Sequence, residues 1–145
     1  MKKTLIKGAK VLVDGRFTAC AILIGDGKIL ELDYRSEVPE DTLVVDGNGK
    51  FLVPAFIELH AHGGGGFDFA DNTQEAFDSV MKTHLAHGVT LLCPTLMTAP
   101  WGQTVKSLEF IESHGKGSPM FGGVHLDWCL HSIFPPSCRF HYIRG

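Results

Sequence analysis

The sequence lacks any apolar run of the roughly 18 residues that a membrane-spanning helix needs. Its basic start, residues 1–7, is not followed by the apolar segment and small-residue cleavage site of a secretory signal. Positive charge is not in excess either: lysine and arginine number 13 and acidic residues 16, for a formal net charge of -3. We therefore expect a cytoplasmic protein that binds no membrane and has no nucleic acid as its main partner.

Cysteine is scarce and has no metal-binding or redox spacing. The four residues are Cys20, Cys93, Cys129 and Cys138, and no Cys-x-x-Cys pair occurs among them. Because no secretory signal is present, we expect reduced thiols. Cys93 has no histidine partner in its sequence context, which argues against a cysteine nucleophile.

The first 50 residues predict a small antiparallel β unit. Short apolar stretches alternate with turn signals, of which Asp14-Gly15 is strong because both residues tolerate positive φ. The apolar face of this unit is too small to be stable alone, so we expect it to pack against another element. The expected strands cover residues 5–13, 17–24, 28–32 and 42–45.

A different pattern begins at residue 51. Continuous apolar runs, expected to be strands buried on both faces, alternate with amphipathic segments of helical period. Thr73 is placed to cap the first helix and Gly88 to end it. This alternation predicts an α/β fold whose parallel strands end at one common edge. The strands are expected over 51–60, 89–95 and 120–127, and the helices over 73–87 and 102–113.

His60-Ala61-His62 ends the first of these strands and is the strongest candidate site. Alternate side chains of a strand point to the same face, so both imidazoles can converge on one divalent metal ion. The alternative is that one histidine caps the following loop while the other is exposed. The next four residues, Gly63 to Gly66, either give a ligand close access to backbone amides or form a flexible loop.

Asp127 lies at the end of the third expected strand, on the same edge of the sheet. It is the carboxylate that can complete the metal site; the alternative is a turn residue. His125 shares the strand parity of Asp127 and can face the same way. We expect structural roles for His84, His87 and His114, which lie near the ends of the predicted helices.

The sequence after Asp127 has no helical or strand period. Residues 128–145 mix prolines, cysteines, aromatic residues and histidines, and we expect an irregular, non-homologous tail. Neither His131 nor His141 is therefore expected to be a metal ligand.

These motifs resemble the N-acetylglucosamine-6-phosphate deacetylase family of the amidohydrolase superfamily. The stretch from Leu52 to Gly66, with its histidine pair and glycines, is similar to the family's first barrel strand. The similarity extends from Met1 to about Asp127. It also includes the segments His87-Gly88-Val89-Thr90, Pro94-Thr95-Leu96 and Gly123-Val124-His125-Leu126.

The resemblance implies a partial (β/α)8 TIM barrel over residues 51–127, with about three strands and two helices. Part of a small β-sandwich domain, residues 1–50, would precede it. The implied metal ligands are His60, His62 and Asp127, and the implied ion is a divalent metal (zinc, iron, manganese or cobalt). The implied reaction is metal-dependent hydrolysis of an amide in an amino-sugar phosphate, and a homo-oligomer is compatible with it.

The sequence departs from the family pattern at three places. Ala55 stands for the glycine of Pro-Gly-Phe, and Asp127 for the metal-binding glutamate of His-Leu-Glu-Gly-Pro-Phe. Trp128-Cys129-Leu130 then replaces Gly-Pro-Phe. The family's later metal histidines and catalytic aspartate lie beyond this point, so we assign no catalytic residue in this chain. A complete barrel needs about 250 residues, and we expect a truncated chain that is inactive alone.

Two other functions stay open at this stage. One is a non-catalytic α/β fragment or binding protein that keeps a partial metal site without turnover. The other is a different amidohydrolase, resembling a dihydroorotase or an adenine deaminase, although the four glycines after His62 argue against it.

Overall fold

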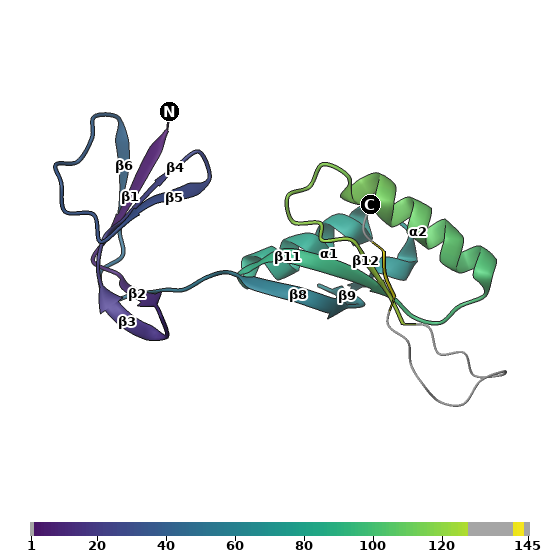
Figure 1. Cartoon of the computed structure of the whole chain (residues 1–145). Helices are drawn as coiled ribbons and strands as arrows, with labels where there is room; N and C mark the ends of the chain where they lie inside the picture. The colour runs from purple at the N-terminus through teal and green to yellow at the C-terminus, as the bar shows by residue number, and fades with distance from the viewer. Residues whose placement is uncertain (1, 128–140, 144–145) are drawn as a thin grey trace. The chain divides into compact units, whose positions relative to one another are not determined.

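The computed structural model describes residues 2–127 and 141–143, and the chain divides into two compact units, Met1–Pro54 and Ala55–Gly145 (Figure 1). Each unit has its own sheets and its own apolar cluster. Among the described residues, no helix is long and apolar enough to span a bilayer.

The first unit consists of two small β-sheets. Its strands are β1 (Lys3–Lys7), β2 (Lys10–Val13), β3 (Arg16–Ala19), β4 (Ile22–Gly25), β5 (Lys28–Leu32), β6 (Thr42–Asp46) and β7 (Phe51–Leu52). One sheet has the order β5-β4-β1-β6, in which only the β1–β6 pair is parallel. The other has the order β3-β2-β7, in which β2 is antiparallel to β3 and parallel to β7.

The expectation of a purely antiparallel unit is therefore wrong. Residues 5–13 do not form one strand, because Gly8 turns the chain at a φ of 77° and sends β1 and β2 into different sheets. Residues 17–24 are likewise divided between β3 and β4. The predicted turn at Asp14-Gly15 is confirmed: both residues have positive φ, and they join the antiparallel strands β2 and β3.

The apolar cluster of the first unit is small, as the sequence predicts. Several large apolar side chains of β5 and β6 stay exposed, including Ile29 at 61% and Leu43 at 64%. The assignment of these sheets to a β-sandwich domain stays a prediction. The cluster consists of Ala9, Val11 and Ile22, with Ile6, Val13, Cys20, Ile24 and Leu52 packed against them.

The second unit has the predicted α/β architecture. Its main elements are, in chain order, β8 (Phe56–Ala61), α1 (Gln74–Ala86), β11 (Val89–Leu96), α2 (Trp101–Gly115) and β12 (Val124–Leu126) (Figure 1). The strands β8, β11 and β12 are parallel, with β11 in the middle. Between β8 and α1 lie a short hairpin, β9 (Gly63–Gly64) with β10 (Phe67–Asp68), and a 3-10 turn, η1 (Phe69–Asp71).

Two of the expected strands are shorter than predicted. The apolar stretch 51–60 is divided between β7 and β8, because Pro54 has no N–H to donate to a sheet. Nor is β8 buried on both faces: it is the last strand in its sheet, and Phe56 and Ile57 are each 61% exposed. The stretch 120–127 forms a strand only over β12.

Both helices lie where the sequence predicts them. Thr73 caps α1, because its side-chain oxygen accepts a hydrogen bond of 3.2 Å from the N–H of Ala76. His87 is the C-cap, and Gly88 follows it with a φ of 87°, as expected of a residue that ends a helix.

One apolar cluster joins the helices to the sheet. It includes residues of η1, both helices and all three parallel strands, so the ends of these strands are attached to a common core. Its buried members are Ala61, Phe69, Phe77, Val80, Met81, Val89, Leu92, Leu96, Ile111, Met120, Val124 and Leu126.

Residues His141–Ile143 form a short strand, β13, that pairs antiparallel with β12. This strand corrects the expectation of an irregular tail for these three residues. Tyr142 and Ile143 are residue types that favour strands, and the pairing covers an edge of β12. The rest of the expected tail, 128–140 and 144–145, lies outside the described residues.

The cap of α1 gives a test of the fold. Replacing Thr73 by alanine should lower the free energy of unfolding by about 1 kcal/mol, because the N–H of Ala76 loses its acceptor. Thr73→Ser, which keeps the hydroxyl, is the matched control and should lose much less. Urea denaturation of both variants measures the difference, and equal stability of the two would contradict the assigned cap.

Candidate metal centre

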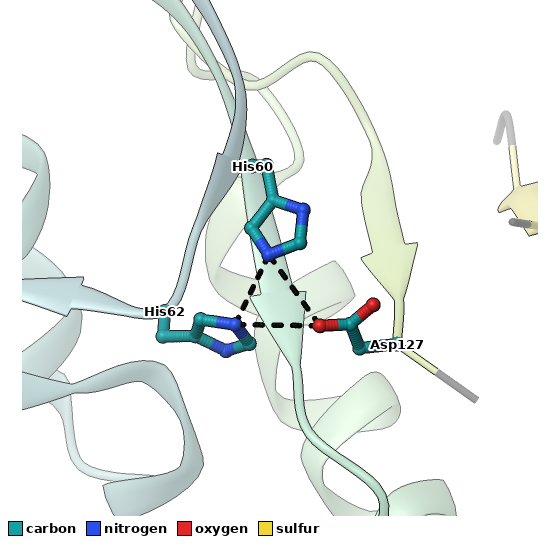
Figure 2. Close-up of side chains that lie close together, drawn as sticks. All are labelled: His60, His62 and Asp127. Atoms are coloured by element: carbon teal, nitrogen blue, oxygen red, sulfur yellow. Dashed lines mark hydrogen bonds and ion pairs between the residues drawn. The ribbon is translucent and has the colours of Figure 1, made fainter. Parts of the chain in front are cut away.

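Three side chains from the ends of two strands, β8 and β12, which lie on either side of β11, converge in the second unit. His60 lies in β8, His62 follows it, and Asp127 follows β12 (Figure 2). The two histidine Nε2 atoms are 3.1 Å apart. Asp127 Oδ2 lies 3.4 Å from Nε2 of His60 and 3.6 Å from Nε2 of His62. The structure thus brings together the three residues that were predicted from the sequence as metal ligands.

The spacing of these three atoms fits the inner coordination sphere of a single metal ion. A triangle with sides of 3.1, 3.4 and 3.6 Å has a circumradius of about 2 Å. Zinc lies about 2.0–2.2 Å from the histidine nitrogens and carboxylate oxygens that bind it in proteins. A point therefore exists that lies at bonding distance from all three donor atoms.

The triad is open to solvent on one side. The side chains of His60, His62 and Asp127 are 42%, 32% and 33% exposed, respectively. A metal site whose protein ligands leave one position open can accept water or substrate, which distinguishes catalytic from structural zinc sites.

The backbone of β8 directs both histidines to the same face of the sheet. They are two residues apart, and Ala61 between them is buried in the apolar cluster. The N–H of His60 donates to Glu58 Oε1 (3.0 Å), and the N–H of Ala61 donates to Thr95 Oγ1 of β11 (3.0 Å). Glu58 and Thr95 were not predicted as supporting residues. The signal that could have indicated Thr95 is its position directly after Pro94 in a strand, because proline has no N–H to donate to the ladder.

Asp127 is held from the neighbouring strand and its following loop. Its N–H donates to the carbonyl of Leu96 at the end of β11 (2.9 Å). Its carbonyl accepts a hydrogen bond from the Thr98 hydroxyl (2.8 Å). The main chain of Asp127 is thus fixed on both sides, which orients its carboxylate toward the histidine pair.

His125 lies beside the triad. Its Nδ1 is 3.0 Å from the carbonyl of Leu59, and a carbonyl oxygen only accepts, so this nitrogen carries a proton. The ring centroid of His125 is 4.7 Å from that of His60, edge to face. His125 therefore supports His60 and does not belong to the converging group.

Comparison with known proteins gives this geometry a context. No protein-family model matches the chain. The human N-acetylglucosamine-6-phosphate deacetylase is 37% identical over 140 residues, which cover 83% of this chain and 33% of the relative. The mouse deacetylase is 35% identical over 138 residues, with the same coverage. A dihydroorotase of Macrococcus caseolyticus is 30% identical over 121 residues, covering 78% of this chain and 26% of the relative.

Solved deacetylase structures have the same fold over this region. The N-acetylglucosamine-6-phosphate deacetylase of Pasteurella multocida has a TM-score of 0.75 at 21% identity, over 86% of this chain and 34% of that chain. A mutant deacetylase of Mycobacterium smegmatis, solved in complex with N-acetyl-D-glucosamine-6-phosphate, has a TM-score of 0.70. It is also 21% identical, over 87% of this chain and 32% of that chain.

The chain corresponds to the N-terminal portion of an N-acetylglucosamine-6-phosphate deacetylase, in the amidohydrolase superfamily. The resemblance predicted from the motifs is thereby confirmed. The chain spans about a third of the length of the deacetylases that it matches.

The glycine run of this deacetylase-like segment is packed against α1. A Cβ at Gly63 would overlap the carbonyl oxygen of Phe67, and one at Gly65 would lie 2.5 Å from Thr83 Oγ1. His84 Nε2 donates to the carbonyl of Gly63 (3.2 Å). Gly63 and Gly65 are therefore needed for close packing of the β9–β10 hairpin, an explanation that neither sequence-based alternative included.

The helix histidines have the structural roles expected of them. Besides the contact of His84, His87 Nδ1 is 2.8 Å from the carbonyl of Thr83, and His114 Nδ1 is 2.8 Å from that of Phe110. His131 and the side chain of His141 lie outside the described part of the chain.

Cys93 is buried in β11 and is a free thiol, as is the half-buried Cys20. Burial raises the pKa of the Cys93 thiol above its ordinary value, and the negative charge of Glu58 adds to the increase. The thiol therefore stays protonated at neutral pH, which agrees with the argument against a nucleophile. Cys129 and Cys138 lie outside the described residues.

The raised pKa of Cys93 predicts slow alkylation. At pH 8, iodoacetamide should modify Cys93 at least about tenfold more slowly in the native chain than in urea, because less thiolate forms and access is blocked. The rate should increase as the pH approaches the raised pKa. Peptide mapping by mass spectrometry measures each cysteine separately, with Cys20 as the internal control. Equal rates for Cys93 with and without urea would be inconsistent with the buried thiol.

Proposed function

We propose that this chain supplies part of the metal centre of an N-acetylglucosamine-6-phosphate deacetylase, with His60, His62 and Asp127 as metal ligands. The observation that carries the proposal is the convergence of these three donor atoms at bonding distance from one point. The match to the human deacetylase over 83% of this chain supports the choice of reaction.

The donor set suits a divalent transition metal. Two imidazole nitrogens and one carboxylate are ligands that bind zinc, and iron, manganese and cobalt are also compatible with them. Each histidine donates the lone pair of Nε2 in its neutral form, and the Asp127 carboxylate offsets part of the charge of the ion. When bound, such an ion polarises a carbonyl and makes water acidic enough to attack an amide at neutral pH.

The proposed substrate is the acetamido group of N-acetylglucosamine 6-phosphate. Support comes from the M. smegmatis deacetylase, which was solved in complex with that compound. The exposed side of the triad leaves space for the acetyl carbonyl to approach. A cytoplasmic location and a homo-oligomer stay predictions, and the net charge of -3 does not favour nucleic acid as a partner.

Metal binding without turnover is the second candidate function. Amide hydrolysis requires a group that gives a proton to the leaving amine. Among the residues that the structure describes, two acidic side chains contact the histidine pair, and both are engaged: Asp127 is a proposed ligand, and Glu58 accepts the N–H of His60. We therefore expect this chain alone to bind the metal but to lack the complete proton-transfer machinery.

The metal proposal is tested by elemental analysis. Wild-type chain dialysed against zinc should retain about one ion per molecule. The double variant H60A/H62A should retain less than about a tenth of that, because two of three ligands are lost. The matched control is H87A/H114A, which removes two histidines that hydrogen-bond to carbonyls of their own helices and should leave the zinc content unchanged. Equal zinc content in all three proteins would refute the site.

Acetate release tests catalysis. With zinc, manganese or cobalt present, this chain should release no acetate from N-acetylglucosamine 6-phosphate above the rate of the metal alone. The human deacetylase serves as the positive control for the assay. Release above the metal blank that H60A/H62A abolishes would contradict the expectation and make the chain a deacetylase by itself.

A further inference from the structure

Thr95 stands out among the buried polar residues because it bonds to the peptide between the two candidate metal ligands. Its side chain is fully buried, at 0% exposure, in β11. The hydroxyl accepts a hydrogen bond from the N–H of Ala61 (3.0 Å) and donates one to the carbonyl of Cys93 (3.2 Å). One hydroxyl thus connects the end of β8 to the backbone of β11.

The irregular pairing of the two strands explains why a side chain takes this position. Register between β8 and β11 shifts after the pair Glu58–Leu92, and the next pair is Ala61 with Pro94. A shift of this kind disrupts the regular ladder, and the proline adds no N–H to it. The threonine hydroxyl lies where it accepts a hydrogen bond from the Ala61 N–H, beside the ladder pair of Ala61 with Pro94.

The orientation of the peptide group that carries the Ala61 N–H affects the directions of the His60 and His62 side chains. The N–H of Ala61 belongs to the peptide that joins Ala61 to His60, and Ala61 directly precedes His62. Rotation of this peptide would change the backbone angles on both sides and separate the two Nε2 atoms, which are 3.1 Å apart. Ala61 has its side chain in the apolar cluster, which anchors the opposite face but leaves the peptide plane to be fixed by a hydrogen bond.

We propose that Thr95 is the positioning residue of the histidine pair: its hydroxyl holds the peptide between His60 and His62 so that both imidazoles converge. The geometric part of this inference concerns the metal-free chain, whereas its consequence for metal affinity rests on the proposed function. Outer residues that orient metal ligands typically change metal affinity 10–100-fold when they are replaced.

Two substitutions separate the hydroxyl from the packing of the side chain. Thr95→Val keeps the shape and removes the hydroxyl, whereas Thr95→Ser keeps the hydroxyl and removes a methyl group. Thr104→Val in α2 is the matched control, because Thr104 is also buried and its hydroxyl also donates to a backbone carbonyl, that of Ala99. A purely structural role of Thr95 would make T95V and T104V behave alike.

NMR of the metal-free chain tests the geometry. Nuclear Overhauser contacts between the rings of His60 and His62 should be present in wild type, T95S and T104V and be lost in T95V. The Ala61 amide should also exchange with solvent at least about tenfold faster in T95V than in T104V, because only T95V removes the hydroxyl to which this N–H donates. Retained ring contacts together with unchanged amide exchange in T95V would overturn the inference.

Zinc affinity, measured by competition with a chelator, tests the consequence. T95V should bind zinc at least about tenfold more weakly than wild type, whereas T95S and T104V should stay within about threefold. Wild-type affinity in T95V would overturn the role in metal binding. If wild type itself binds no zinc while T95V loses the ring contacts, the proposed function fails and the geometric inference stands.

Discussion

The parallel pairing of β8 with β11 is the interaction on which the candidate metal centre depends. β8 is the last strand of its sheet in the described structure, so β11 is the neighbour that fixes its position. β11 also packs through Leu92 and Leu96 into the cluster that joins the sheet to both helices. A shift of one residue between the two strands would turn His60 and His62 to the opposite face. The histidine pair therefore takes its geometry from the pairing of β8 with β11, whereas Asp127 is placed by the pairing of β12 with β11.

Much of the second unit was predictable because its signals are local. The helical period, the cap at Thr73 and the glycine at position 88 each specify a helix through nearby residues. The errors came from interactions between distant residues. No local pattern indicates that β6 pairs in parallel with β1, or that the two strands on either side of Pro54 belong to different units. Edge position, which leaves Phe56 and Ile57 exposed, is likewise a property of the whole sheet.

The three candidate ligands were predictable because strand parity and strand ends are visible in the sequence. His60 and His62 share a face by spacing alone, and Asp127 follows a strand of the same parallel sheet. The supporting bonds were not predictable, since they cross between elements. Thr95 reaches Ala61 over 34 residues, and His125 reaches Leu59 over 66 residues. The glycine run had a different explanation than expected, because the nearness of β10 to Gly63 and of α1 to Gly65 appears only in three dimensions.

The distribution of the donor atoms along the chain has a thermodynamic consequence. Two of them come from the end of β8 and the third from beyond β12, with α1, β11 and α2 between them. An ion bound to all three acts as a crosslink that closes this long stretch of chain, and such closures remove the most entropy from the unfolded state. The complete donor set exists only when β12 has joined the sheet, so the ion binds the folded state alone. The free energy of metal binding therefore adds to the free energy of unfolding. A bound ion would then stabilise the folded second unit in addition to taking part in catalysis.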